Sequence, residues 1–252
     1  MSGHSKWSQI KRQKQKTDIK RGLIFTKIAN AIMIAVRQGG GVTDPNQNFR
    51  LRLAVDGARS VNMPKENIER AIQRALKKEA GDIEEVFYEG FAPGGVAMII
   101  KAATDNKNRT TSEIKNLIEK NGGTFSNQGA VSWMFADQGL ISVAKNNKSF
   151  DEIFETAADT GAEDIKESGN IVEVYTSPTN LFRIKNLLSE KGLIILDAQL
   201  YKDPTITSEI KDSETARKTI ALIDKLEELE DVLNVYANFE ISDNLMESIK
   251  SE

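Results

Sequence analysis

The spacing of apolar residues divides this chain into two parts. Over residues 1–78, apolar side chains recur every three to four positions, which is the spacing of one face of an α-helix. Three amphipathic helices are predicted there, at 18–38, at 46–61 and from Pro64 onward. The glycines at 39–41 end the first helix because they accept a positive φ. The pattern therefore predicts a small all-helical N-terminal domain.

From Ile83 onward the apolar residues come in short runs rich in β-branched side chains, and helical patterns alternate with them. Pro93-Gly94-Gly95 marks a hairpin turn, and Thr110 with Glu113 has the spacing of a capping box that opens a helix. The predicted elements are strands at 86–91 and 96–103, a helix from 110 to 121, strands at 130–135 and 139–144, a helix at 150–160, strands at 162–165 and 171–175, a helix at 178–191, a strand at 193–200, a helix at 214–230 and a strand at 232–239.

The order of these elements predicts an α+β fold. The middle of the second part reads strand-helix-strand-strand-helix-strand, which is the order of a ferredoxin-like unit. The last helix and strand need partners, and the earlier sheet is incomplete without them. We therefore predict an all-helical basic domain at 1–78 followed by two α/β domains. A ferredoxin-like domain at 138–204 is inserted into a middle domain built from 79–137 and 205–252.

Charge is divided at the same place as the apolar pattern. Residues 1–78 hold 17 basic and five acidic residues, a net charge of +12, whereas residues 79–252 carry −15. The whole-chain charge of −3 hides this division. A basic part of this kind most often meets nucleic acid or a membrane surface, so residues 1–78 are predicted to bind nucleic acid. A solvated basic tail and an acidic protein partner are the alternatives.

The densest positive charge lies near the amino terminus. Residues 2–17 have only two bulky apolar side chains, Trp7 and Ile10, so an arm or a frayed helix is predicted. Phosphate contacts by such cations give affinity without sequence information. Trp7 adds a flat surface suited to unpaired bases, or an anchor for docking onto the helices. The predicted nucleic-acid contacts in this segment are Lys6, Trp7, Lys11, Arg12, Lys14, Lys16, Lys20 and Arg21.

Four arginines on the predicted outer faces of the helices extend this surface. Arg70 and Arg74 lie opposite the apolar stripe of the third helix, and Arg52 and Arg59 share one side of the second. Each is predicted to position the phosphate backbone unless it meets a guanine edge. No helix carries an obvious set of base-reading side chains, so RNA is favoured over a specific DNA site.

A polar cluster at 105–109 falls between a predicted strand and the start of a helix, where binding residues often gather. One interpretation is ordinary capping of the free helix amides. Another is a phosphate contact through the helix N-terminus. An enzyme working between the two α/β domains would use the same side chains in polar roles. The candidate cleft contacts are Asp105, Asn106, Lys107 and Arg109.

Other chemistry finds little support in the sequence. The chain has no cysteine, and its single histidine, His4, lies in the predicted arm, so no metal site and no catalytic residue is predicted. The glycine-rich stretches fit turns and lack the pattern of a phosphate loop. The acidic run at 227–231 is interpreted as a solvated helix end. No cofactor, small-molecule substrate or membrane contact is predicted, and a cytoplasmic location is expected.

Several sequence motifs resemble those of the YebC family. They occur in order over residues 3–135, and the carboxyl half is similar in layout but more diverged. Phe49 and the pair at 127–128 depart mildly from the expected pattern without removing a charge or a glycine that matters here. The motifs are GHSKW at 3–7, KRG at 20–22 with IFTK at 24–27, RLRLA at 50–54, NMPK at 62–65 with IERAI at 68–72, YEGF at 88–91 with PGGVA at 93–97, TDNKNRT at 104–110, KNGG at 120–123 and VSWMF at 131–135.

The resemblance implies a basic helical domain and two α/β domains around a cleft, with no enzymatic activity and no shared catalytic residues. Members of the family are described as DNA-binding transcriptional regulators, and also as ribosome-associated translation factors related to the mitochondrial translational activator of cytochrome oxidase. The favoured hypothesis is a non-enzymatic translation factor that binds ribosomal RNA through residues 1–78. A DNA-binding transcriptional regulator is the alternative, and an enzyme using the cleft is the second.

Overall fold

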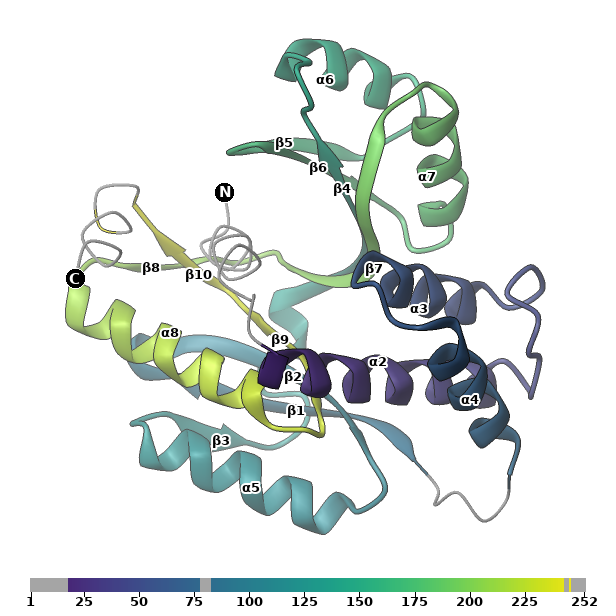
Figure 1. Cartoon of the computed structure of the whole chain (residues 1–252). Helices are drawn as coiled ribbons and strands as arrows, with labels where there is room; N and C mark the ends of the chain where they lie inside the picture. Colours follow the sequence, from purple (N-terminus) through teal and green to yellow (C-terminus); the bar gives the residue numbers. More distant parts are fainter. Residues whose placement is uncertain (1–17, 78–82, 243–244, 246–252) are drawn as a thin grey trace.

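The computed structural model describes residues 18–77, 83–242 and 245 of the chain. A helical N-terminal region is followed by two four-stranded sheets, each with helices packed on one face (Figure 1). This arrangement confirms the predicted fold class. The predicted arm at 2–17 lies outside the described residues.

The N-terminal region consists of the helices α2 (Asp18–Gln38), α3 (Phe49–Ser60) and α4 (Lys65–Leu76). Asn48 sets the start of α3, because its side-chain oxygen accepts from the Leu51 amide at 3.1 Å and its amide group donates to the Ala35 carbonyl at 2.9 Å. The helix therefore begins later than the predicted start at Asn46. The buried core of this region is formed by Ile32, Met33, Ala35, Val36, Leu51, Val55, Ala58, Met63, Ile68, Ala71 and Ala75.

The first sheet has the strand order β3-β1-β2-β9, and every pair in it is antiparallel. Its strands are β1 (Glu84–Ala92), β2 (Val96–Thr104), β3 (Thr124–Ser126) and β9 (Val232–Ala237). The helices α5 (Lys107–Lys120) and α8 (Ser213–Glu228) cover one face of it (Figure 1). Met98, Ile100, Ile118 and Ile223 are buried between the sheet and these helices. The helix α8 and the strand β9 thus complete the sheet that was predicted to need further elements.

The second sheet has the order β5-β6-β4-β7, again antiparallel throughout. This is the arrangement of a ferredoxin-like unit, as predicted. Its core joins Ile141, Val174, Ile153 and Ile184. The elements are β4 (Phe135–Ala144), α6 (Phe150–Ala158), β5 (Asp164–Ser168), β6 (Ile171–Thr176), α7 (Leu181–Glu190) and β7 (Ile194–Pro204).

The two sheets meet through an aromatic cluster. The ring of Tyr201 contacts Tyr175 and Tyr236 edge-on, with centroids 6.4 and 5.5 Å apart. On the other side of the ferredoxin-like unit, Phe49 and Leu53 of α3 pack against its core. Each of the three parts therefore touches another through apolar surface. The residue boundaries predicted between the three domains stay a prediction.

Some local predictions for the second part of the chain are wrong. The segment predicted as a strand at 130–135 is a turn followed by the 3-10 helix η2 (Ser132–Met134), and the strand lies earlier, at β3. The segment after Pro204, for which no strand was predicted, contains β8 (Ser208–Ile210), which pairs in parallel with β10 (Phe239–Ile241). Asn238 separates β10 from β9, because its side chain accepts from the Ala97 amide at 2.8 Å.

Candidate nucleic-acid interface

The cations of the helical region fall into two groups with different surroundings. Lys27, Arg37, Arg50 and Arg52 contact other parts of the protein. The second group, on the carboxyl end of α3 and on α4, is exposed. The sequence could not separate them, because both lie at polar positions of amphipathic helices. The exposed group is the one available to a polyanion, and its members are Arg59, Lys65, Arg70, Arg74 and Lys77.

The outer face of α4 carries Arg70 and Arg74, and the exposed Lys77 follows as the C-cap residue. Residues four apart lie above one another on a helix, so Arg70 and Arg74 point to the same side. The opposite face is buried in the core through Ile68 and Ala71. Within the described residues, no ion pair of these three cations is found. We call this set, Arg70, Arg74 and Lys77, the α4 cationic row.

Arg59 lies in the last turn of α3, and its positive charge is partly balanced by an acid. Its side chain is 72% exposed, and its Nη1 lies 3.7 Å from Oδ1 of Asp56. Asp56 also pairs with Lys185 of α7, so the carboxylate is shared between two cations. Arg59 is therefore exposed and cationic, but less available than Arg70 or Arg74.

Arg52 has a different setting from the one that the sequence suggested. Its guanidinium carbon lies 4.1 Å from the ring centroid of Phe182 in α7, and its Nε donates to the Pro45 carbonyl at 2.7 Å. A planar guanidinium on an aromatic face is a favourable cation–π contact. Arg52 thus joins α3 to the ferredoxin-like unit. Its role in nucleic-acid binding stays a prediction that this geometry does not favour.

The remaining predicted contacts lie at or before the start of the described chain. The backbone of Lys20 belongs to the first turn of α2, and Arg21 follows it with an exposed side chain. The predicted contacts Lys6, Trp7, Lys11, Arg12, Lys14 and Lys16 lie outside the described residues.

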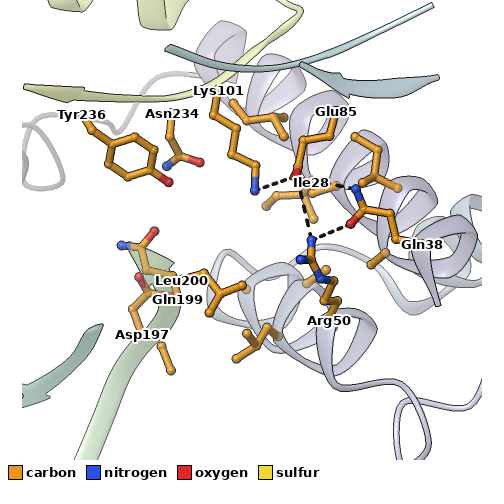
Figure 2. A pocket seen from close by; sticks show the side chains of 18 residues that line it. Ile28, Gln38, Arg50, Glu85, Lys101, Asp197, Gln199, Leu200, Asn234 and Tyr236 are labelled. Carbon is orange, nitrogen blue, oxygen red and sulfur yellow. Dashed lines mark hydrogen bonds and ion pairs between the residues drawn. The ribbon is translucent and has the colours of Figure 1, made fainter. Parts of the chain in front are cut away.

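A pocket of about 210 Å³ lies where the helical region and the two sheets meet (Figure 2). Glu85 is held between two cations there, with Lys101 Nζ at 2.7 Å and Arg50 Nη1 at 3.7 Å. Arg50 also donates to the side-chain oxygen of Gln38 at 2.5 Å. The β7 residues Asp197 and Gln199 form the facing wall. The pocket is thus lined by both positively and negatively charged groups. Sequence analysis did not identify these polar residues as a site.

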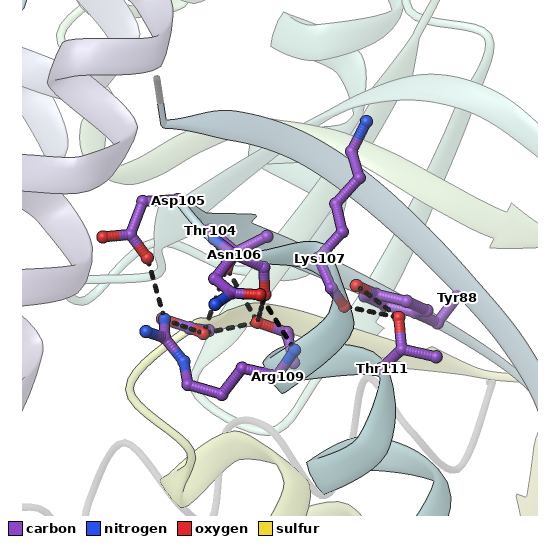
Figure 3. Close-up of polar contacts among 9 residues, drawn as sticks. Tyr88, Thr104, Asp105, Asn106, Lys107, Arg109 and Thr111 are labelled. Carbon is purple, nitrogen blue, oxygen red and sulfur yellow. Dashed lines mark hydrogen bonds and ion pairs between the residues drawn. The ribbon is translucent and has the colours of Figure 1, made fainter. Parts of the chain in front are cut away.

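The four candidate cleft contacts do not line this pocket. Asn106 is the N-cap of α5, since its side-chain oxygen accepts from the Arg109 amide at 3.1 Å (Figure 3). Lys107 extends away from the cap and pairs with Glu84 at 2.7 Å. Asp105 pairs with Arg109 at 3.0 Å. The contacts of the cluster are those of a capped and paired helix start.

The capping box predicted at Thr110 and Glu113 is wrong. Thr110 lies within the first turns of α5, and its hydroxyl donates to Oδ2 of Asp231 at 2.5 Å. The same carboxylate oxygen accepts from Arg109 at 2.8 Å, and this contact with Asp231 is the main reason that the pKa of Arg109 is raised. Asp231, assigned from sequence to a solvated helix end, is therefore the anchor that ties β9 to the start of α5.

Glu89 is a buried carboxylate that the sequence did not single out. It lies in β1 and accepts from the backbone amides of Gly129 at 2.8 Å, Val131 at 2.7 Å and Ser132 at 3.1 Å. Burial raises the pKa of Glu89, but these amide hydrogen bonds lower it more, so the pKa lies below its usual value. An amide held by this carboxylate cannot join a strand ladder, which is why 130–135 is not a strand.

The loop that Glu89 holds exposes Trp133. The side chain of Trp133 is 63% exposed, although the apolar pattern around it had predicted a strand position. The exposure of an aromatic residue follows from the turn conformation, and no signal in the local sequence distinguishes this case from a strand. Trp133 is thus the functional candidate that sequence reasoning missed.

The described part of the chain has neither a membrane-spanning helix nor a metal site. No helix within it has the length and apolar character needed to cross a bilayer. No group of three or more histidine, cysteine or acidic side chains within it is arranged to hold a metal ion.

The chain is similar to known proteins over nearly its whole length. Residues 5–78 match the TACO1/YebC protein N-terminal domain, and residues 83–239 match the TACO1/YebC second and third domain. A protein of Sulfurihydrogenibium sp. named as a probable transcriptional regulatory protein is 47% identical over 252 residues, which cover 99% of this chain and 100% of the relative. A relative of the same designation from Persephonella marina is 47% identical over 251 residues, with 99% and 100% coverage. The crystal structure of a conserved hypothetical protein from Aquifex aeolicus has a TM-score of 0.85 and 44% identity, covering 90% of this chain and 93% of that one.

Proposed function

The chain belongs to the TACO1/YebC family, and from this membership and its charge distribution we propose that it is a non-enzymatic regulator of gene expression. In this proposal the helical N-terminal region binds nucleic acid, and RNA on the ribosome is the working partner. The two sheets then determine how far the helical region extends and how it is oriented on the nucleic acid.

The observation that carries this proposal is the α4 cationic row. Its three side chains are exposed at and just after the outer face of α4, whereas Lys27, Arg37, Arg50 and Arg52 are used in contacts within the protein. Cations aligned on a helix neutralise successive phosphates and release their counterions, which gives affinity without reading the sequence. The proposal therefore predicts binding that is strong at low salt and weakly sequence-specific.

RNA is favoured over duplex DNA because of the acids that share the face. Glu66 and Glu69 are exposed on α4 next to the cationic row. A helix inserted into the major groove has phosphates on both of its sides, so acids on it are repelled. A shallow contact with the backbone of a folded or single-stranded RNA places phosphates on one side of the helix only, so these acids meet less repulsion.

A DNA-binding transcriptional regulator is the second candidate, and a specific observation favours it. Relatives 41–47% identical to this chain are named as probable transcriptional regulatory proteins. An enzyme in the cleft between the sheets has less support, because the candidate cleft contacts are engaged in capping and ion pairs at the start of α5.

Ribosome co-sedimentation tests the proposal, with Arg70→Ala/Arg74→Ala compared with Lys115→Ala/Lys120→Ala. Each double variant removes two exposed cations, but only the first removes them from α4. We expect wild type and the α5 control to sediment with ribosomes, and the α4 variant to be largely released. Equal sedimentation of all three would refute the role of α4. A footprint at a defined promoter that survives physiological salt, without ribosome binding, would favour the DNA alternative.

A further inference from the structure

Trp133 is the most exposed of the large apolar side chains in the described part of the chain. It is 63% exposed, compared with 50% for Leu76 and 47% for Ile206. Aromatic side chains usually lie mostly buried, because their apolar area gives a large gain when it leaves water. An indole that stays exposed to solvent is therefore unusual, and a binding role would explain it.

The exposed ring is fixed in place by two sets of hydrogen bonds. Its Nε1 donates to the Ala130 carbonyl at 3.1 Å, which restricts the rotation of the side chain. The backbone under it is held by the Glu89 carboxylate through the amides of Val131 and Ser132. The N–H of the indole is thus already used within the loop. What the ring presents to solvent is an immobilised aromatic surface with no unused donor.

Several exposed residues of the same loop are polar. Asn127, Gln128 and Ser132 are exposed in the same loop. On the other side, the Thr205 amide donates to the Met134 carbonyl at 2.8 Å, which brings the segment after β7 against the loop. Amide and hydroxyl side chains around a flat aromatic face can hydrogen-bond the edge of a heterocycle that stacks on it.

We propose that Trp133 is a preformed stacking platform for an unpaired base of a single-stranded nucleic acid, a contact that rests on the proposed function. Size decides between a base and a protein as the occupant. A stable protein interface covers about 800 Å² on each partner, whereas Trp133 is the one large apolar side chain that this loop exposes. A single base matches one indole, and stacking tolerates any base because every base has an aromatic face.

The chain offers a direct optical test, because it contains two tryptophans, Trp7 and Trp133. In the full-length Trp7→Phe variant, Trp133 is the only source of indole emission. Titration with a fluorescein-labelled single-stranded RNA oligonucleotide gives two readouts: anisotropy reports binding, and indole emission reports stacking. We expect the indole emission to fall and to saturate at the same oligonucleotide concentration as the anisotropy.

The second readout is the affinity for the oligonucleotide, measured in proteins that retain Trp7. Trp133→Ala should weaken oligonucleotide binding by roughly tenfold, because one stacked base is lost, and should leave the salt dependence unchanged, because no cation is lost. Trp133→Phe should recover most of the affinity. When the stacked base is removed from the oligonucleotide by an abasic nucleotide, Trp133→Ala should cause a smaller loss of affinity.

The outcomes separate this proposal from the proposed function. If the oligonucleotide binds while indole emission stays constant and Trp133→Ala binds as tightly as wild type, the platform is refuted and the proposed function stands. If Trp133→Ala loses ribosome co-sedimentation while keeping full oligonucleotide affinity, Trp133 docks on a protein and the proposal is wrong. If no oligonucleotide binds to wild type at low salt, the proposed function fails, and the platform fails with it.

Discussion

The Glu89 carboxylate and the Val131 backbone amide lie 2.7 Å apart and join a buried strand to the loop that exposes Trp133. Glu89 is 3% exposed, so its charge is stable there only because hydrogen bonds replace the lost water. One buried side chain thereby determines the conformation of a surface segment.

Replacing this carboxylate should destabilise the protein. In Glu89→Gln the new NH₂ group faces backbone donors, so at least one buried hydrogen bond is lost. We expect the free energy of unfolding to fall by about 2–3 kcal/mol. Urea denaturation measures it, with Glu119→Gln as the exposed control. An unchanged unfolding free energy would contradict the structural role of Glu89.

The stabilisation by Glu89 should also depend on pH. The pKa of this carboxyl is lowered in the folded state from 4.5, so its contribution is complete above the unfolded pKa and is lost as pH falls through the folded pKa. The difference in unfolding free energy between wild type and Glu89→Gln should therefore shrink as the pH falls below 4.5. A difference that stays constant from pH 7 to pH 3 would be the contrary result.

The stacking of Arg52 on Phe182 should contribute to stability and not to binding. Removing either partner should cost about 1 kcal/mol, and the double variant Arg52→Ala/Phe182→Leu should cost less than the sum of the two. The coupling comes from a double-mutant cycle in urea. If Arg52→Ala instead lowered nucleic-acid affinity with no loss of stability, Arg52 would belong to the binding surface as the sequence suggested.

Asp231 should act as a structural anchor of α5. Asp231→Asn weakens the hydrogen bond from Thr110 and removes the ion pair with Arg109, so we expect about 2 kcal/mol lower stability. Its affinity for an RNA oligonucleotide should equal that of wild type. Lower affinity without lower stability would indicate that the start of α5 binds nucleic acid.

The sequence predicted the layout of this protein well because periodic burial is a local property. The helix at 18–38 and the ferredoxin-like order both follow from apolar spacing. The sequence pattern did not predict contacts between residues that are distant in the sequence. The strand assigned at 130–135 failed because Glu89, some forty residues earlier, takes the loop amides.

The candidate site was predicted only in part for the same reason. Charge counting placed the cations on the helical region, but only the packed structure separates Arg52, stacked on Phe182, from Arg74, exposed on α4. The exposure of Trp133 depends on a turn that the local sequence pattern does not predict.

The salt dependence of RNA binding tests the central claim most directly, namely that α4 contacts phosphates. A plot of log affinity against log salt concentration should be less steep for Arg70→Ala/Arg74→Ala than for wild type, by about 1.4 if each arginine contacts one phosphate of a single strand. Lys115→Ala/Lys120→Ala should keep the wild-type slope. Parallel lines for wild type and the α4 variant would contradict the account.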